Sequence, residues 1–379
     1  MAKKPASSPA KRAAKPAGSK AAPRSLKPAA VQQIEAKPTP SVPTLGLEAI
    51  IGHDDAITTI RRAMGSGRLH HAWVFEGPPG IGKFTTALAF ARLALTPAEA
   101  GGTAADEVTP DLHVITKELA AVSRVATVRD SKQRNIAKAV LDEFLIEPAT
   151  RTRVGRPGSL VSRAFIIDEA ELIEDAGQNS LLKTLEEPPV GSLIVLVTSR
   201  PDRLLPTIRS RSHRVAFRPL DATAMGRWLG SRDLSGLDAA ARDWLVDYAD
   251  GSPGMASLAL ATGLSQWHGA LTPLLMEADH GRFPLTLGTV GSKLLSAWSE
   301  AWVDANPSAS KDAANKSAAR LLFRMIHEHY RKRARRDPES SRRAIELTAR
   351  AERYAEAGVQ PVFVLDHLAA GLAAIGREG

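Results

Sequence analysis

The stretch "WVFEGPPGIGKFTTALAFA", which begins at Trp73, constrains the fold more than any other part of the sequence. A short apolar run of β type leads into Gly77, Gly80 and Gly82, and an apolar helical pattern follows. Glycines allow a tight turn whose backbone N–H groups converge on one point, toward which the following helix directs its positive N-terminal end. The sequence therefore predicts a phosphate-binding loop in which Lys83 reaches phosphate oxygens. An ordinary strand-to-helix turn is the alternative.

Phe84 follows the lysine of this loop, where the usual motif has Ser or Thr. That hydroxyl is a ligand of the Mg²⁺ ion that bridges the phosphates, and a phenyl ring cannot coordinate a hard cation. Thr85 and Thr86 do not replace it, because each step along a helix turns the side chain by about 100°. We therefore expect weak, Mg²⁺-independent nucleotide binding at most, without efficient phosphoryl transfer.

The chain from Leu45 to about Phe217 alternates short β-like runs with helical stretches, which is typical of a parallel sheet covered on both faces. The expected strands are Ala72–Phe75, Asp111–Ile115, Ala164–Asp168, Leu193–Thr198 and Arg214–Phe217. Two segments, Ala98–Pro110 and Ala149–Ser159, are predicted to be exposed loops. The predicted fold class of this region is α/β.

The strand patterns end after Pro219, and only helical patterns follow. We expect an α/β domain over residues 45–218, a small helical domain over 219–263 and a second helical domain over 264–379. The longest helices of that last domain are predicted in three segments, Lys316–Arg336, Ser340–Gly358 and Pro361–Ile375.

The net charge of +9 lies almost entirely in the first 44 of the 379 residues. These residues hold nine Lys or Arg and one acid, Glu35, for a net +8, while the rest of the chain holds 41 basic and 40 acidic residues. The segment is rich in Ala, Lys, Pro and Ser and has no apolar periodicity, so we expect a disordered tail. It is either a solubilising extension or a flexible arm that contacts DNA phosphate or an acidic partner.

The cysteine count and the hydropathy pattern limit the class of protein. The chain has no Cys, which excludes disulfides and thiolate metal sites. No apolar run is long enough to cross a bilayer, and the basic N-terminus is not followed by the apolar segment of a secretory signal. We expect a cytoplasmic protein.

A pair of acidic residues, Asp168 and Glu169, ends the apolar run of "RAFIIDEAELI". An Asp at the carboxyl end of a strand beside a phosphate loop is placed to hold Mg²⁺ or its water shell, and an adjacent Glu can orient an attacking water. Acidic pairs after strands are common, so the prediction depends on the loop upstream.

The segment "GQNSLLKTLEEPPVGSLIVLVTSRPDRLLPTIRSRSHRVAF" resembles the clamp-loader family of AAA+ proteins, and so does "IIGHDDAITTIRRAMGSGRLHHAWVFEGPPGIGK". The resemblance covers about Leu45 to Leu220. It implies an AAA+ P-loop domain, a helical lid and an all-α collar. By the same resemblance Thr198 takes the sensor 1 position, and Arg211, within the motif of Ser210 to Ser212, takes the position of an arginine finger.

An arginine finger acts on the nucleotide of the adjacent subunit. The γ-phosphate gains negative charge as it leaves, and a guanidinium supplied from outside stabilises that charge. This raises the rate of hydrolysis by about 10³- to 10⁵-fold. A solvated surface arginine is the alternative for Arg211. The resemblance also places Met255 where ATP-hydrolysing relatives carry an Arg, and methionine cannot pair with phosphate.

The pattern resembles the clamp-loader subunit that keeps the fold and the finger but has lost its own ATPase site. This implies gamma/tau and delta subunits as partners, contact with the sliding clamp and primed DNA through the complex, and no membrane. We expect the chain alone not to be a competent ATPase. Two alternatives stay open: an ATP-hydrolysing subunit of gamma/tau type, which Asp168 and Glu169 favour, and a nucleic-acid-binding module that depends on the basic tail.

Relatives of this kind often carry a four-cysteine zinc module, for which this chain has the segment Ala98–Pro110. We therefore expect no zinc, no required cofactor, and at most weak binding of ATP or ADP. One further pattern is a basic stripe at helical spacing, predicted to be a solvated face or, alternatively, a contact for a subunit or DNA. Its members are Arg320, Arg324, His327, Arg331 and Arg335.

Overall fold

The computed structural model describes residues 46–67, 69–97, 110–130, 135–150, 157–305 and 310–378. The predictions for the basic tail therefore lie outside the described residues. So do those for most of Ala98–Pro110 and for residues 151–156 of the second predicted loop.

Five parallel strands form one sheet in the order β2-β3-β4-β1-β5. The predicted strands are confirmed, with every boundary within one residue. The strands are β1 (Ala72–Glu76), β2 (Leu112–Ile115), β3 (Arg163–Ile167), β4 (Ser192–Thr198) and β5 (His213–Ala216).

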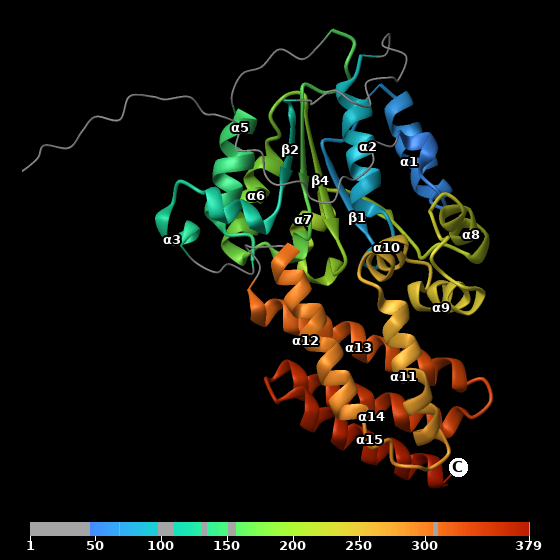
Figure 1. Ribbon diagram of the computed structural model, residues 1–379. Helices are drawn as coiled ribbons and strands as arrows, with labels where there is room; N and C mark the ends of the chain where they lie inside the picture. Colours follow the sequence, from blue (N-terminus) through green and yellow to red (C-terminus); the bar gives the residue numbers. More distant parts are fainter. Residues whose placement is uncertain are drawn as a thin grey trace, which may run out of the picture. The chain divides into compact units, whose positions relative to one another are not determined.

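Alternating side chains of β1 enter two different cores. Trp73 and Phe75 face α2 (Lys83–Leu95), where their rings lie 5.1 and 6.1 Å from that of Phe90. Ala72 and Val74 point to the opposite face and join the cluster that contains residues of α4 (Lys138–Leu141) and α6 (Asp175–Glu186). Figure 1 shows α2 and α6 on opposite sides of the strands, so both faces of the sheet are covered.

The rest of the α/β region consists of short elements. Before β1 lie η1 (Leu47–Ala49) and α1 (Asp54–Gly65). Between β2 and β3 the described chain forms, besides α4, the elements η3 (Lys117–Val122), α3 (Ala126–Arg129), the π-helical turn η4 (Asp142–Ile146) and α5 (Glu147–Thr150). After β3 follow η5 (Ala170–Leu172), η6 (Pro201–Arg203) and α7 (Pro206–Ser210).

The chain after β5 is helical in all its described elements. Three short helices come first: α8 (Ala222–Gly230), α9 (Ala239–Ala249) and α10 (Pro253–Ala261). Five longer ones follow: α11 (Leu264–Asp279), α12 (Leu287–Ala305), α13 (Lys311–Arg333), α14 (Pro338–Glu356) and α15 (Pro361–Glu378). These helices share one apolar core, which includes Tyr248, Leu322 and Leu368. None of the described helices has the length and apolarity needed to cross a bilayer.

Side-chain caps explain where several of these helices begin. Asp221, Asp238 and Ser252 each accept a hydrogen bond from the N–H three residues later, at the start of α8, α9 and α10. Ser310 and Asp337 do the same for α13 and α14. Such a cap stabilises a helix by about 1 kcal/mol, because it satisfies a donor that the helix itself cannot pair.

Phe165, fully buried in β3 and stacked at 4.9 Å on His113, tests how much the sheet depends on its core. We expect Phe165→Ala to lower the free energy of unfolding by about 3–5 kcal/mol, because it removes apolar burial and leaves a cavity. Urea denaturation of the whole chain measures this. The matched control is Phe363→Ala on α15, where the ring is 63% exposed, and a similar loss in both variants would contradict the assignment.

Candidate phosphate-loop site and exposed arginine

The carboxyl ends of β1, β3 and β4 bring the predicted loop residues to one edge of the sheet. Glu76, the last residue of β1, is paired in register with Thr198 of β4, and Asp168 directly follows β3. The loop from Gly77 to Gly82 connects β1 to α2. In a parallel sheet, the crevice beyond the carboxyl ends of the strands is the usual place for a ligand.

The three loop glycines adopt backbone conformations that other residues rarely take. Gly77, Gly80 and Gly82 have φ angles of 149°, 74° and 106°. The first hydrogen bond of α2 runs from the Thr86 N–H to the Gly82 carbonyl, so the N–H groups before it are unpaired donors of the first turn. The tight turn that the glycine spacing predicts is therefore present, and phosphate binding by it stays a prediction.

Lys83 is buried, with 5% of its surface exposed, and its ammonium is held by the loop itself. Nζ donates to the carbonyls of Gly77 and Pro78 at 2.7 and 2.6 Å and to Oγ of Ser199 at 3.2 Å. Burial lowers the pKa of Lys83 to about 8, and the carboxylates of Glu171 and Asp168 oppose that shift. The lysine thus ties the loop to the end of β4.

The start of α10 supplies donors to the next two loop carbonyls. The Ser252 hydroxyl donates to the Pro79 carbonyl at 3.2 Å, and the Gly254 N–H donates to the Gly80 carbonyl at 2.7 Å. A Cβ atom added to Gly254 would lie 2.8 Å from Cα of Gly80, closer than real Cβ contacts. The two backbones therefore meet at a glycine–glycine contact, which we call the loop–lid joint (Pro79, Gly80, Ser252 and Gly254).

His53 holds the loop from the other side. Its Nε2 lies 2.6 Å from the Ile81 carbonyl, and because a carbonyl only accepts, Nε2 carries the proton. Burial lowers the pKa of His53, which keeps the ring neutral at pH 7 and above. The ring also packs edge-on against Phe217, with centroids 4.9 Å apart.

Asp168 lies half-buried beside this loop, and this burial raises its pKa to about 6. The neighbouring carboxylates of Glu169 and Glu171 push in the same direction, whereas the Glu169 N–H, which donates to Oδ1 at 3.0 Å, and Lys83 oppose the rise. A half-buried carboxylate of this kind can hold a proton or face a cation near neutral pH.

The two glutamates near Asp168 take different directions. Glu169, in the left-handed conformation with φ 49°, forms an exposed ion pair with Lys117 at 2.6 Å. Glu171 instead accepts the Ser199 N–H at 3.2 Å and acts electrostatically on Lys83. Glu171 is therefore the second carboxylate near the loop lysine, a residue that the sequence analysis did not single out.

The positions of Thr198 and Phe84 limit what this site can do. Thr198 is fully buried, and its Oγ1 accepts the Arg200 N–H at 3.0 Å. Phe84 is half-buried in the first turn of α2, and the Thr86 hydroxyl donates to the Gly82 carbonyl. In the described part of the chain no three His, Asp or Glu residues cluster so as to hold a metal ion. The site therefore offers hydrogen-bond donors to an anion. The residue after Lys83 has no hydroxyl group that could bind Mg²⁺.

Arg211 lies away from these residues in the fold, at the end of α7, and is exposed. Its Nη2 pairs with Oε1 of Glu186, the last residue of α6, at 2.9 Å, and Nη1 donates to the Thr207 carbonyl at 3.3 Å. The side chains of Arg211 and Glu186 are 39% and 50% exposed. A pair as exposed as this stabilises a fold by at most about 1 kcal/mol.

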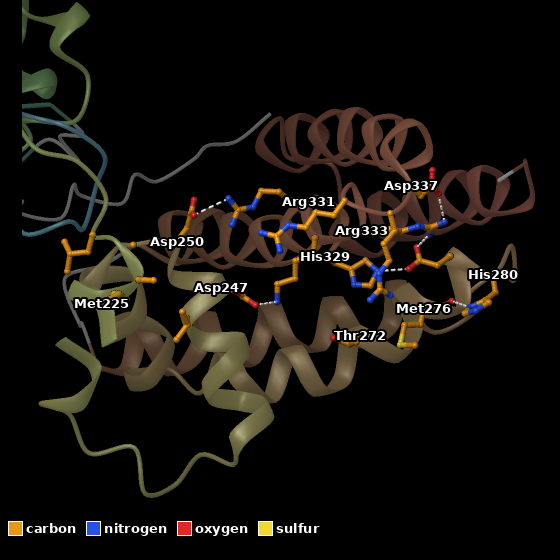
Figure 2. Close-up of a pocket in the computed structure, with 18 residues that line it drawn as sticks. Met225, Asp247, Asp250, Thr272, Met276, His280, His329, Arg331, Arg333 and Asp337 are labelled. Atoms are coloured by element: carbon orange, nitrogen blue, oxygen red, sulfur yellow. Dashed lines mark hydrogen bonds and ion pairs between the residues drawn. The ribbon is translucent and has the colours of Figure 1, made fainter. Parts of the chain in front are cut away.

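A cavity of about 970 Å³ lies elsewhere, between α8 and α9 on one side and α11 and the α13–α14 turn on the other. Figure 2 shows Arg331 directed toward Asp250 and Arg333 toward Asp337, at 3.2 and 2.9 Å. Lys332 pairs with Asp247 at 2.5 Å. Arg331 and Lys332 are thus paired with acids on the α9 side of the cavity, and Arg333 with an acid on its own side.

Most residues of the predicted basic stripe also have a partner on another helix of this chain. Arg320 pairs with Glu356 at 3.2 Å, His327 lies 3.8 Å from Glu352, and Arg324 donates to the Tyr248 carbonyl at 3.1 Å. Arg335 has no acidic partner among the described residues. The stripe therefore mostly joins helices of this chain, and a contact with a subunit or DNA stays a prediction.

The structure thus brings Gly77, Gly80, Gly82, Lys83 and Asp168 to one place and leaves Glu169 and Arg211 outside it. The residues that sequence reasoning missed are His53, Glu171, Ser252 and Glu186. Of these, Ser252 had a signal, since a Ser before Pro at the first helical position is a typical cap. Nothing local distinguished the other three.

With this geometry established, comparison with known proteins relates one part of the chain to a family. Residues 52–221 match the family model described as DNA polymerase III, delta subunit. The match covers less than half of the chain, so it shows that this region is similar to that family. The predicted α/β fold with a parallel sheet is confirmed, and the matched region contains both the phosphate loop and Arg211.

The similar curated proteins include subunits of DNA polymerase III. DNA polymerase III subunit gamma/tau of Mycobacterium tuberculosis is 30% identical over 188 residues, which are 46% of this chain and 29% of that protein. DNA polymerase III subunit tau of Escherichia coli is 27% identical over 282 residues, which are 72% of this chain and 40% of that protein. The chain spans less than half the length of these relatives.

Two solved structures show weak similarity. One is a DNA polymerase III gamma subunit-related protein of Thermotoga maritima, with 16% identity and a TM-score of 0.39 over 85% of this chain and 99% of that one. The other is the RuvB Holliday junction branch migration motor of the same organism, with 16% identity and a TM-score of 0.40 over 57% and 62%. Neither score is high enough to bear on function.

The loop–lid joint predicts a steric effect at Gly254. We expect Gly254→Ala to lower the free energy of unfolding by about 1–3 kcal/mol, because the new methyl group meets Gly80 backbone that cannot move cheaply. Hydrogen exchange at the amides of residues 80–83 should rise as well. The control is Gly226→Ala on α8, which has no heavy atom within 4 Å of the added Cβ and should gain about 0.5–1 kcal/mol. Equal effects at both sites would contradict the joint.

The half-buried Asp168 predicts a dependence of stability on pH. Because burial raises its pKa to about 6, the folded chain keeps a proton that the unfolded chain releases near pH 4, so this group destabilises the fold progressively from pH 4 to 6. Asp168→Asn should therefore be more stable than the natural chain above pH 6, by on the order of 2 kcal/mol.

That difference should shrink toward pH 4, and denaturation at pH 4 to 8 measures it. The matched control is Asp243→Asn on α9, an exposed carboxylate. A stability difference that is constant across this range would show that Asp168 is not the cause.

Proposed function

We propose that this chain is the delta prime subunit of a DNA polymerase III clamp loader. In this proposal it supplies Arg211 to ATP bound by a neighbouring subunit, contacts gamma/tau and delta through its helical collar, and helps to load the sliding clamp on primed DNA in the cytoplasm. The family match of residues 52–221 supports a place in this complex. The choice among its subunits rests on the two sites described above.

The observation that carries the proposal is an asymmetry between those sites. At the loop, Phe84 stands where the Mg²⁺-binding hydroxyl belongs, Met255 stands in place of an arginine, and loop carbonyls are bonded to Lys83 and the lid. At the end of α7, Arg211 is exposed and held by one surface ion pair and one hydrogen bond to a backbone carbonyl. A guanidinium in that condition is free to serve an external phosphate, whereas the loop lacks a metal ligand for efficient hydrolysis.

A gamma/tau-type ATPase is the second candidate. Two observations favour it: Asp168 lies half-buried and interacts electrostatically with Lys83, and the relatives named above are gamma/tau proteins. This candidate requires the isolated chain to hydrolyse ATP with Mg²⁺ at a rate that Lys83→Ala abolishes. The delta prime proposal requires the isolated chain to be inactive, with no required cofactor and no zinc, and any nucleotide binding to be weak.

The test is a clamp-loader complex reconstituted from this chain with gamma/tau and delta. We expect Arg211→Ala to lower ATP turnover at the site that it faces by about 10³-fold or more, because transition-state charge is no longer neutralised. ATP turnover by the whole complex should then fall by at least the fraction of the total turnover that this site contributes. Assembly, measured by gel filtration, should be unchanged.

Two control variants sharpen this experiment. Arg227→Ala removes another exposed arginine, on α8, and should leave turnover unchanged. Lys83→Ala should have little effect if the loop of this chain does not hydrolyse ATP. Full turnover with Arg211→Ala would refute the finger, and loss of turnover with Lys83→Ala would favour the ATPase instead.

A further inference from the structure

We infer that Glu186 is a positioning residue for Arg211, and that its carboxylate holds the guanidinium until phosphate oxygens of the neighbouring nucleotide replace it. This inference rests on the proposed function, in which Arg211 acts on another subunit. It adds that the Glu186 carboxylate competes with the nucleotide for Arg211. When the subunits meet, the guanidinium moves from this carboxylate to the phosphate oxygens.

The geometry places Glu186 and Arg211 at the ends of two helices that contact each other. Glu186 is the last residue of α6, and Arg211 caps the C-terminus of α7. The guanidinium lies between the Glu186 carboxylate at 2.9 Å and the Thr207 carbonyl at 3.3 Å. Both acceptors belong to this chain, so they fix the position of the guanidinium before a neighbouring subunit binds.

The exposure of this pair makes the exchange feasible. Half of the Glu186 side chain already faces solvent, so when Arg211 leaves, the carboxylate is hydrated and no buried charge remains. Phosphate oxygens accept two parallel hydrogen bonds from one guanidinium, which makes them stronger acceptors than a surface carboxylate held through a single ion contact. The ion pair is therefore strong enough to favour one position of the Arg211 side chain, but too weak to hold it there against phosphate oxygens.

Removal of the competitor should then favour engagement of the finger. We expect Glu186→Gln to raise ATP turnover of the reconstituted complex by up to about fivefold, the limit set by the strength of an exposed ion pair. The gain should decrease as salt is added, because salt screens the pair in the natural chain and removes its advantage there. A merely structural role for Glu186 would not produce this salt dependence.

Glu187 provides a matched control. It is the next residue, it is also an exposed glutamate, and within the described residues it forms no ion pair. Glu187→Gln changes the net charge of the same surface by the same amount and should leave turnover unchanged. Glu186→Asp keeps the negative charge on a shorter side chain and should lie between the natural chain and Glu186→Gln.

The decisive experiment is a double-mutant cycle in the reconstituted complex with Mg²⁺ and ATP, comparing the natural chain, Glu186→Gln, Arg211→Ala and the double variant. The expected result is a gain from Glu186→Gln when Arg211 is present and no change when it is absent. If Arg211→Ala lowers turnover but Glu186→Gln has no effect, or the same effect in both backgrounds, the inference is wrong and the proposed function stands. If Arg211→Ala itself leaves turnover unchanged, the proposed function fails and takes this inference with it.

Discussion

The hydrogen bonds to the carbonyls of the phosphate loop are the interactions on which the site depends. Lys83, Ser252, Gly254 and His53 together bond the five carbonyls from Gly77 to Ile81. Because the carbonyls are held from outside, the backbone direction of the loop is fixed by the protein itself. The glycine–glycine contact also makes the loop and the first turn of α10 one mechanical unit, since neither backbone can shift without breaking a hydrogen bond of the other.

The features that the sequence predicted correctly are local ones. The five strands were found because buried parallel strands are short apolar runs bounded by turn residues, as in "LIVLVT". The tight turn between β1 and α2 was predicted because glycine readily adopts positive φ angles, such as those of Gly80 and Gly82, which other residues rarely take. In both cases the information lies within about ten residues, so no knowledge of the tertiary fold was needed.

The features that the sequence could not predict depend on distant partners. Glu169 lies beside Asp168 in the chain, yet its left-handed backbone and Lys117 turn it away from the loop, while Glu171 takes the inner position. His53 meets Ile81 across 28 residues, and Glu186 meets Arg211 across 25. A spacing rule cannot find such pairs, because the contact is created by the packing of helices against the sheet.

The ion pairs along α13 have a consequence for encounters with other molecules. Arg320, Arg331 and Lys332 each face an acid of the same chain, and residues 45–379 hold 41 basic and 40 acidic residues. Opposite charges only a few ångströms apart cancel at distances beyond a Debye length, which is about 8 Å at physiological salt. Residues 45–379 therefore exert little long-range attraction on a polyanion. Recognition of a partner by this region then depends on short-range contacts between the two surfaces.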